Sequence, residues 1–134
     1  MPKKYLLGWA LPVAMALLVA ESGAWAHHSF AMYDETKTLH AQATIKEFLW
    51  GAPHSSVSLV VMNDDGTTQT MTLQGAAPTT IVRQGFTPRD FHAGMKVEVS
   101  WHPLLDGRPG GALMGLKLED GRIYLDNTFG TPAG

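Results

Sequence analysis

Apolar and polar residues alternate with a period of two along much of the chain after its first third, a pattern typical of β-strands that bury one face. In the segment 38–50 apolar residues take every second position up to Ile45. The phase shifts at residues 46–47, after which Phe48 and Trp50 are the apolar positions. Because a β-bulge shifts the phase in this way and lets a long strand curl, we predict a bulged first strand.

Four further strands and two short helical turns are expected from the same kind of pattern. The strands are predicted at 54–62, 68–73, 95–101 and 112–118, with a short extension at 122–125. The turn at 63–66 joins the first two of these as a hairpin. A helix is predicted at 78–84, because proline suits a first helical turn and a glycine follows the last residue, and one more turn is expected at 87–90. The tail from Asp126 is expected to be loose.

The order of these elements is that of a five-stranded OB-type barrel, with three strands, a short helix and two more strands. We therefore predict an all-β fold with one short helix, built as a small OB-like barrel, and a small open β-sandwich is the competing architecture. One core is expected to contain Leu39, Ile45, Val57, Leu59, Val97, Val99, Trp101 and Leu116. A chain of this length is sufficient for one such core and too short for two.

The start of the chain has the three-part order of a secretory signal peptide, predicted to cover residues 1–26. A basic start is followed by an apolar run at 5–20, and Ala24 and Ala26 fit the small-x-small cleavage rule. Cleavage after Ala26 would leave a single periplasmic domain, 27–134, with no stable membrane insertion. An uncleaved membrane anchor is the alternative, because the apolar run approaches the roughly 18 to 20 residues that span a bilayer.

Charge and cysteine content narrow the range of functions. The whole chain has 10 basic and 12 acidic residues, and loss of Lys3, Lys4 and Glu21 with the signal peptide leaves 8 and 11, a net charge of −3. A mildly acidic domain without a basic run lacks the concentrated positive surface that nucleic acid binding needs. The absence of cysteine excludes disulfides, thiolate metal sites and thiol redox chemistry.

Several motifs of the mature chain resemble those of one family of small exported bacterial proteins. They are His27-His28-Ser29-Phe30-Ala31-Met32-Tyr33-Asp34, Trp50-Gly51-Ala52-Pro53-His54-Ser55, Arg83-Gln84-Gly85-Phe86, Gly94-Met95-Lys96-Val97, His102-Pro103-Leu104, and Asp106-Gly107 with Gly110-Gly111. The family is domain of unknown function 6152, and the resemblance implies a periplasmic location and a compact β domain without an established activity. Its members often have Asn-Pro-His where this chain has Ala52-Pro53-His54, so any role of that asparagine is absent here.

A histidine at the mature amino terminus is the most informative chemical feature of the sequence. Cleavage after Ala26 would let His27 chelate one metal ion through its α-amine and its ring. A third nitrogen completes a T-shaped site suited to copper, and Met32 could add a soft thioether for the reduced ion. The predicted metal-binding residues are His27, His28, His54 and His102, with copper as the ion.

Ordinary structural roles compete with this interpretation. A His-His pair at a chain end is often solvated, and a single histidine after a strand is usually a surface residue or a satisfied hydrogen-bonding group. His40, on the polar face of the first strand, and His92, in a turn, are not expected to bind metal. Phe30 and Tyr33 are expected to pack the leader against the barrel. The aromatic residues expected in the core, rather than on a ligand-stacking platform, are Trp50, Phe86, Phe91 and Trp101.

The sequence therefore favours a non-catalytic periplasmic domain that binds copper through His27. The alternative is a metal-free binding module that holds a peptide, a protein partner or an envelope component on its barrel face or loops. A copper oxidase or monooxygenase is less favoured, because such enzymes need a broad substrate surface that the short mature chain barely provides. No nucleophile-elbow motif accompanies Ser29, Ser55 or Ser56, so the sequence gives no sign of a hydrolase.

Overall fold

A computed structural model describes residues 32–130 of the chain. The predicted signal peptide lies outside the described residues, and so do His27, His28 and Phe30. Within the described range no helix is long and apolar enough to cross a membrane.

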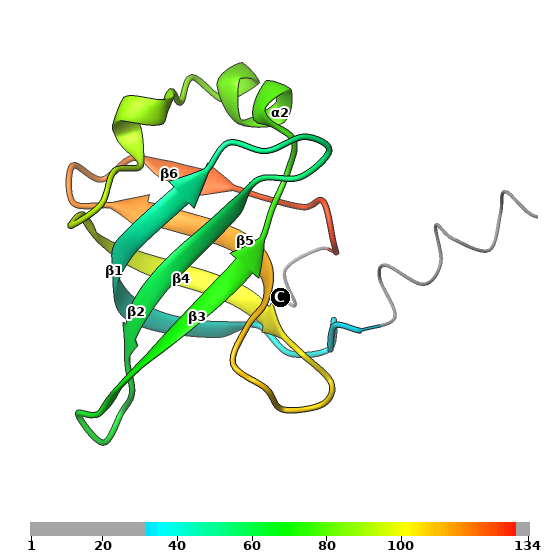
Figure 1. Ribbon diagram of the computed structural model, residues 1–134, viewed down its shortest axis with the longest axis vertical. Helices are drawn as coiled ribbons and strands as arrows, with labels where there is room; N and C mark the ends of the chain where they lie inside the picture. Colours follow the sequence, from blue (N-terminus) through cyan, green and yellow to red (C-terminus); the bar gives the residue numbers. More distant parts are fainter. Residues whose placement is uncertain (1–31, 131–134) are drawn as a thin grey trace, which may run out of the picture.

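The described residues form one sheet with two short helical elements. In chain order they are β1 (Leu39–Leu49), β2 (Ser56–Met62), β3 (Thr68–Gln74), α2 (Pro78–Arg83), the 3-10 turn η1 (Pro88–Asp90), β4 (Lys96–Pro103), β5 (Gly111–Leu118) and β6 (Ile123–Leu125). The sheet order is β3-β2-β1-β4-β5-β6, and β3 also pairs in parallel with β5. This last pairing closes five strands into a barrel (Figure 1). The OB-like prediction is therefore confirmed, and the open sandwich is set aside.

Strand β1 is long because a bulge lets it curve around the barrel. Its register against β2 shifts between Ile45 and Glu47, as the change of phase in the sequence predicts. A second irregularity, between Ser100 and Trp101 in the pairing of β4 with β5, was not predicted. The two bulges together let β1 and β4 bend through the barrel wall.

The barrel interior contains almost all of the predicted core. The predicted residues that are buried are Ile45, Val57, Leu59, Val97, Val99, Trp101 and Leu116. The prediction for Leu39 is wrong, because 41% of this residue is exposed. Leu39 is the first residue of β1, and alternation shows which side of a strand faces inward but not where the strand begins to be covered. Trp50 is half-buried and packs against the same core.

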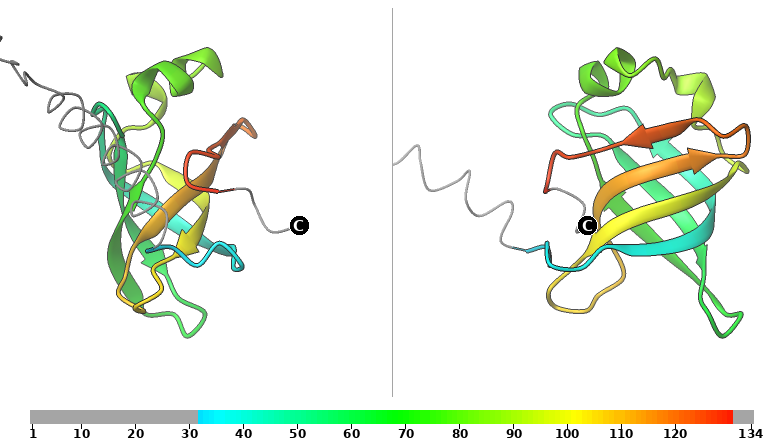
Figure 2. Two further views of the ribbon diagram at one scale, coloured as in Figure 1. Left: turned by 90° about the vertical axis from the view of Figure 1, so that its right-hand side faces the viewer. Right: turned by 180° about the vertical axis from the view of Figure 1, so that it is seen from behind.

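One end of the barrel is covered by α2 and η1 (Figure 2). Aromatic rings from the segments that follow these two elements join the core. Phe91 stacks on Phe86 and on Phe48, with ring centroids 5.2 and 4.9 Å apart. Tyr124 meets Phe86 edge-on at 5.7 Å. Phe86, Phe91 and Trp101 are buried, so the prediction that they belong to the core is confirmed. Aromatic packing leaves little room for a ligand at this end.

The prediction that the tail is loose is wrong as far as the structure describes it, through residues 126–130. Asp126 is 1% exposed, and its carboxylate accepts hydrogen bonds from the backbone N–H of Ala76 and the hydroxyl of Tyr124. Phe129 is 4% exposed. The prediction rested on the general looseness of chain ends, but buried donors on Ala76 and Tyr124 hold the Asp126 carboxylate inside the fold.

Candidate functional site

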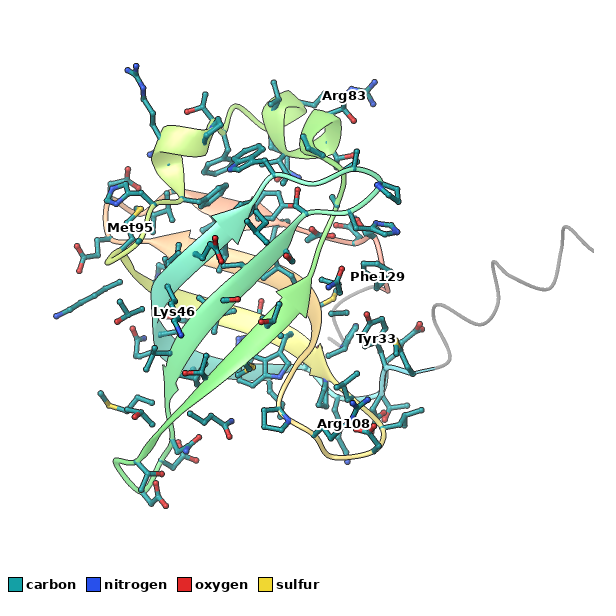
Figure 3. The ribbon with its side chains drawn as sticks, viewed as in Figure 1. Tyr33, Lys46, Arg83, Met95, Arg108 and Phe129 are labelled. Atoms are coloured by element: carbon teal, nitrogen blue, oxygen red, sulfur yellow. The ribbon has the colours of Figure 1, made fainter. Side chains whose placement is uncertain are left out.

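The leader, two loops and the tail meet on one side of the barrel, along the seam where β3 pairs with β5 (Figure 3). They line an open cavity of about 380 Å³, the seam pocket. Its lining consists of Met32 and Tyr33 from the leader, His54 from the β1–β2 connection, Thr72 and Gln74 from β3, Leu104 and residues 108–111 around the β4–β5 loop, and Phe129 from the tail. OB barrels bind ligands on the face of their second and third strands and with these two loops. The seam pocket therefore lies where this fold commonly binds a ligand.

Backbone pairing holds the leader beside the β4–β5 loop. Tyr33 forms a β-bridge with Leu104, and the N–H of Leu105 donates to the carbonyl of Met32 at 2.9 Å. The ring of Tyr33 meets the ring of Phe129 edge-on, with centroids 5.3 Å apart. Tyr33 is 7% exposed, so the prediction that it packs the leader against the barrel is confirmed. Burial also raises the pKa of the Tyr33 hydroxyl, which is therefore neutral at physiological pH.

Arg108 does not make the seam pocket a strong anion site. Its Nε donates to the Asp106 carboxylate at 2.6 Å, and both side chains are well exposed to solvent. The backbone N–H of Arg108 and then its side chain lower the pKa of the Asp106 carboxyl, which stays charged. Because this carboxylate already neutralises the guanidinium, the pocket presents mainly apolar walls with a few polar groups.

His54 is the accessible imidazole of the seam pocket. The residue is exposed, and its ring packs against the ring of Phe129 with centroids 5.0 Å apart. The loop that carries it is fixed by Ser55, whose N–H donates to Ala76 and whose carbonyl accepts from Gly75. No hydrogen bond to a ring nitrogen of His54 is found within the range 32–130.

His102 has the hydrogen-bonding pattern of a metal-binding histidine but is enclosed. It lies within β4 with no exposed surface, and its Nδ1 lies 2.6 Å from the carbonyl oxygen of Lys37. Because a carbonyl only accepts, Nδ1 donates to it, and in the neutral ring Nε2 carries the lone pair. Nε2 is buried and has no partner among the described residues, and a Cβ at Gly130 would lie 3.0 Å from it. Metal-binding histidines usually donate their second N–H in this way, but here Nε2 is covered, with Gly130 lying against it.

The two remaining histidines of the described range lie elsewhere. His40 is exposed on β1 in a shallow groove next to β5 and β6, and His92 is exposed with its Nδ1 3.2 Å from the carbonyl of Ala93. Neither lines the seam pocket. Residues 32–130 contain no group of three or more histidine, aspartate or glutamate side chains placed to hold a metal ion.

The model of a family of unknown function, DUF6152, matches residues 15–113. The chain belongs to this family. No curated protein and no solved structure matches the chain. The DUF6152 match includes all four predicted metal-binding residues and both loops of the seam pocket, and it ends before β6 and the tail.

Sequence reasoning missed Asp126, which holds the tail wall of the seam pocket in place. Its carboxylate accepts hydrogen bonds at 2.7 Å from Ala76, at 2.5 Å from Tyr124 and at 3.0 Å from the N–H of Thr128. Burial raises the pKa of the Tyr124 hydroxyl, and the hydrogen bond to Asp126 raises it further. The available signal was that Asp126 follows Tyr124 by two positions, so an extended chain running out of β6 would point both side chains to the same side.

Proposed function

We propose that the mature form of this chain is a non-catalytic periplasmic domain that binds one copper ion beside the seam pocket. The α-amine and ring of His27 form the chelate, and His54 supplies the third nitrogen. This proposal takes cleavage after Ala26 and export as its premises. Copper accepts such nitrogen ligands readily, and the thioether of Met32 would suit the reduced ion.

The observation that carries the proposal is that Met32 and His54 line the same pocket. Met32 is five positions after His27 in the sequence. Extended chain covers at most about 3.6 Å per residue, so the terminal chelate stays within roughly 18 Å of Met32, at an effective concentration on the order of 0.1 M near the pocket. At that effective concentration the pocket histidine can serve as the third ligand, so the protein should bind copper more tightly than a free peptide with the same terminus.

His54 is preferred to His102 because its ring already faces the pocket. Binding at Nε2 of His102 would require space next to Gly130, although the tautomer of this ring is suitable. His28 is the remaining candidate, since it adjoins the chelating residue in the sequence.

Calorimetric titration of Cu(II) into the exported protein tests the proposal, with the starting residue verified by intact mass. An alanine inserted before His27 should weaken binding about tenfold or more, because the displaced amine can no longer close the same chelate ring. His54→Ala should weaken binding more than His102→Gln, which keeps a polar side chain of similar size in the buried position. His40→Ala and His92→Ala are the matched controls and should leave the affinity unchanged. Equal affinity across all of these variants would refute the terminal copper site.

The second candidate function is that of a metal-free binding module for a peptide, a protein partner or an envelope component. The observation in its favour is the seam pocket itself, whose size and largely apolar walls are those of an organic ligand site. Under this reading copper binding would be weak and insensitive to the start of the chain. Leu104→Ala and Phe129→Ala would then abolish capture of the partner without affecting copper.

A further inference from the structure

We propose that the seam pocket takes the chain's own residues 27–31, with the phenyl ring of Phe30 between Leu104 and Phe129. These five residues lie outside the described range and directly precede Met32, which lines the pocket. The interaction goes beyond the proposed function, because it requires no metal. It would also explain how the terminal chelate is brought next to His54.

The walls of the pocket suit an aromatic side chain. Tyr33, Phe129 and Ala112 form a small buried apolar cluster, and Leu104 is a half-buried residue packed against it. The open volume of about 380 Å³ beside these residues is within the range of small-ligand sites. Because Arg108 is already neutralised by Asp106, an uncharged occupant fits the pocket better than an anion.

The chain is delivered to the pocket edge by fixed backbone contacts. The hydrogen bond from Leu105 to Met32 and the bridge between Tyr33 and Leu104 run the leader along the β4–β5 loop. Phe30 is two positions before Met32, so its Cα lies within about 7 Å of the Cα of Met32. If the chain continues extended, the side chains of Phe30 and Met32 point to the same side, toward the pocket that Met32 lines.

One exposed apolar side chain lines the pocket, and a second lies next to the lining residue Leu104. Met32 is 46% exposed and Leu105 is 63% exposed, and the two are joined by the backbone hydrogen bond. A further apolar residue that packs here would remove this surface from water. Phe30 is the nearest aromatic residue outside the described range.

The test uses the mature chain in EDTA, so that no metal contributes. Nuclear Overhauser contacts are expected between the Phe30 ring and the Leu104 methyl groups. Phe30→Ala should lower the melting temperature by roughly 5 to 10 °C, because a buried phenyl ring is lost, and Phe30→Leu should recover more than half of this loss. Ile123→Ala removes an apolar side chain that is 55% exposed on β6, and as the matched control it should shift the melting temperature by less than about 3 °C.

Each outcome decides the proposal. Absence of the contacts, or Phe30→Ala no more destabilising than Ile123→Ala, would overturn it. Contacts that disappear on dilution would show that a second copy supplies the occupant, which would also overturn it. Contacts and a thermal effect in EDTA, in a protein that then fails to bind copper, would support the docking while refuting the copper site, so the two proposals can fail separately.

Discussion

Replacing Asp126 by alanine should destabilise the domain strongly, although the sequence places this residue in a polar tail. The substitution removes an acceptor that is 1% exposed and leaves the N–H of Ala76 and the hydroxyl of Tyr124 without a partner. Both of those residues are buried as well. The change therefore creates two unsatisfied donors inside the fold.

The magnitude follows from the cost of those donors. A buried donor without an acceptor costs about 1 to 3 kcal/mol, so the two together should cost roughly 4 kcal/mol. Total stability of a domain of this kind is about 5 to 15 kcal/mol, so the loss is a large fraction of it. With a urea dependence of about 2 kcal/mol per molar, the midpoint should fall by roughly 2 M. Asp126→Asn keeps one oxygen acceptor, so its urea midpoint should lie between those of the parent protein and Asp126→Ala.

Urea unfolding of the mature chain, followed by tryptophan fluorescence, measures this difference. Asp106→Ala is the matched control, because Asp106 also accepts the N–H of the residue two positions ahead but is 49% exposed. Asp106→Ala should lower the free energy of unfolding by less than about 1 kcal/mol. If Asp126→Ala lost no more than Asp106→Ala, the account of Asp126 as a buried anchor would be refuted.

Two further predictions concern glycine geometry and pH. Gly111→Ala should destabilise the domain by more than about 3 kcal/mol, because at its φ of +153° a Cβ would lie 2.0 Å from the carbonyl oxygen of His102. Gly121 is the control: its φ is +90° and the space around it is open, so Gly121→Ala should cost only about 1 kcal/mol. Thermal melts of the two variants measure the difference. Hydrogen bonds from the Thr87 backbone and then from Arg122 lower the pKa of Asp90, so its charge stabilises the fold above the unfolded pKa and this contribution is lost as pH falls through the folded pKa. Asp90→Asn should therefore cost about 0.5 to 1 kcal/mol at pH 7. In urea titrations at several pH values, the gap to the parent protein should begin to narrow as the pH falls below about 4 and should close below the folded pKa. A gap that stayed constant down to pH 3 would contradict this assignment.

The alternation of apolar and polar residues predicted most of the fold, because most strands of the barrel follow it. Inward and outward residues alternate along each strand, so Val97 and Val99 could be assigned to the core, and the shift of phase before Phe48 marked the bulge. The order of elements then pointed to the OB topology. Leu39 was misplaced because alternation does not show where neighbouring strands cease to cover a residue.

The site was less accessible to sequence reasoning because its parts come from five segments of the chain. Nothing local relates Met32 to His54 or to Phe129. They reach one pocket through the pairing of β3 with β5, the bridge that holds the leader and the hydrogen bond that holds the tail. The buried state of His102 was also hidden, since it depends on the carbonyl of Lys37 and on the position of Gly130. Long-range contacts of this kind leave no periodic trace in the sequence.

The tail connects the stability of the fold to both proposals. Phe129 contacts the rings of Tyr33 and His54, and the next residue, Gly130, lies against Nε2 of His102. Asp126 fixes the start of this segment by binding groups on the opposite side of the seam. A loosened tail would therefore remove a wall of the seam pocket and open the buried nitrogen of His102 at the same time. We therefore expect a folded Asp126→Asn variant to bind Phe30 more weakly in the seam pocket and to expose His102 more to Cu(II). Because the two effects have opposite signs, this one variant distinguishes the apolar pocket from a metal site at His102.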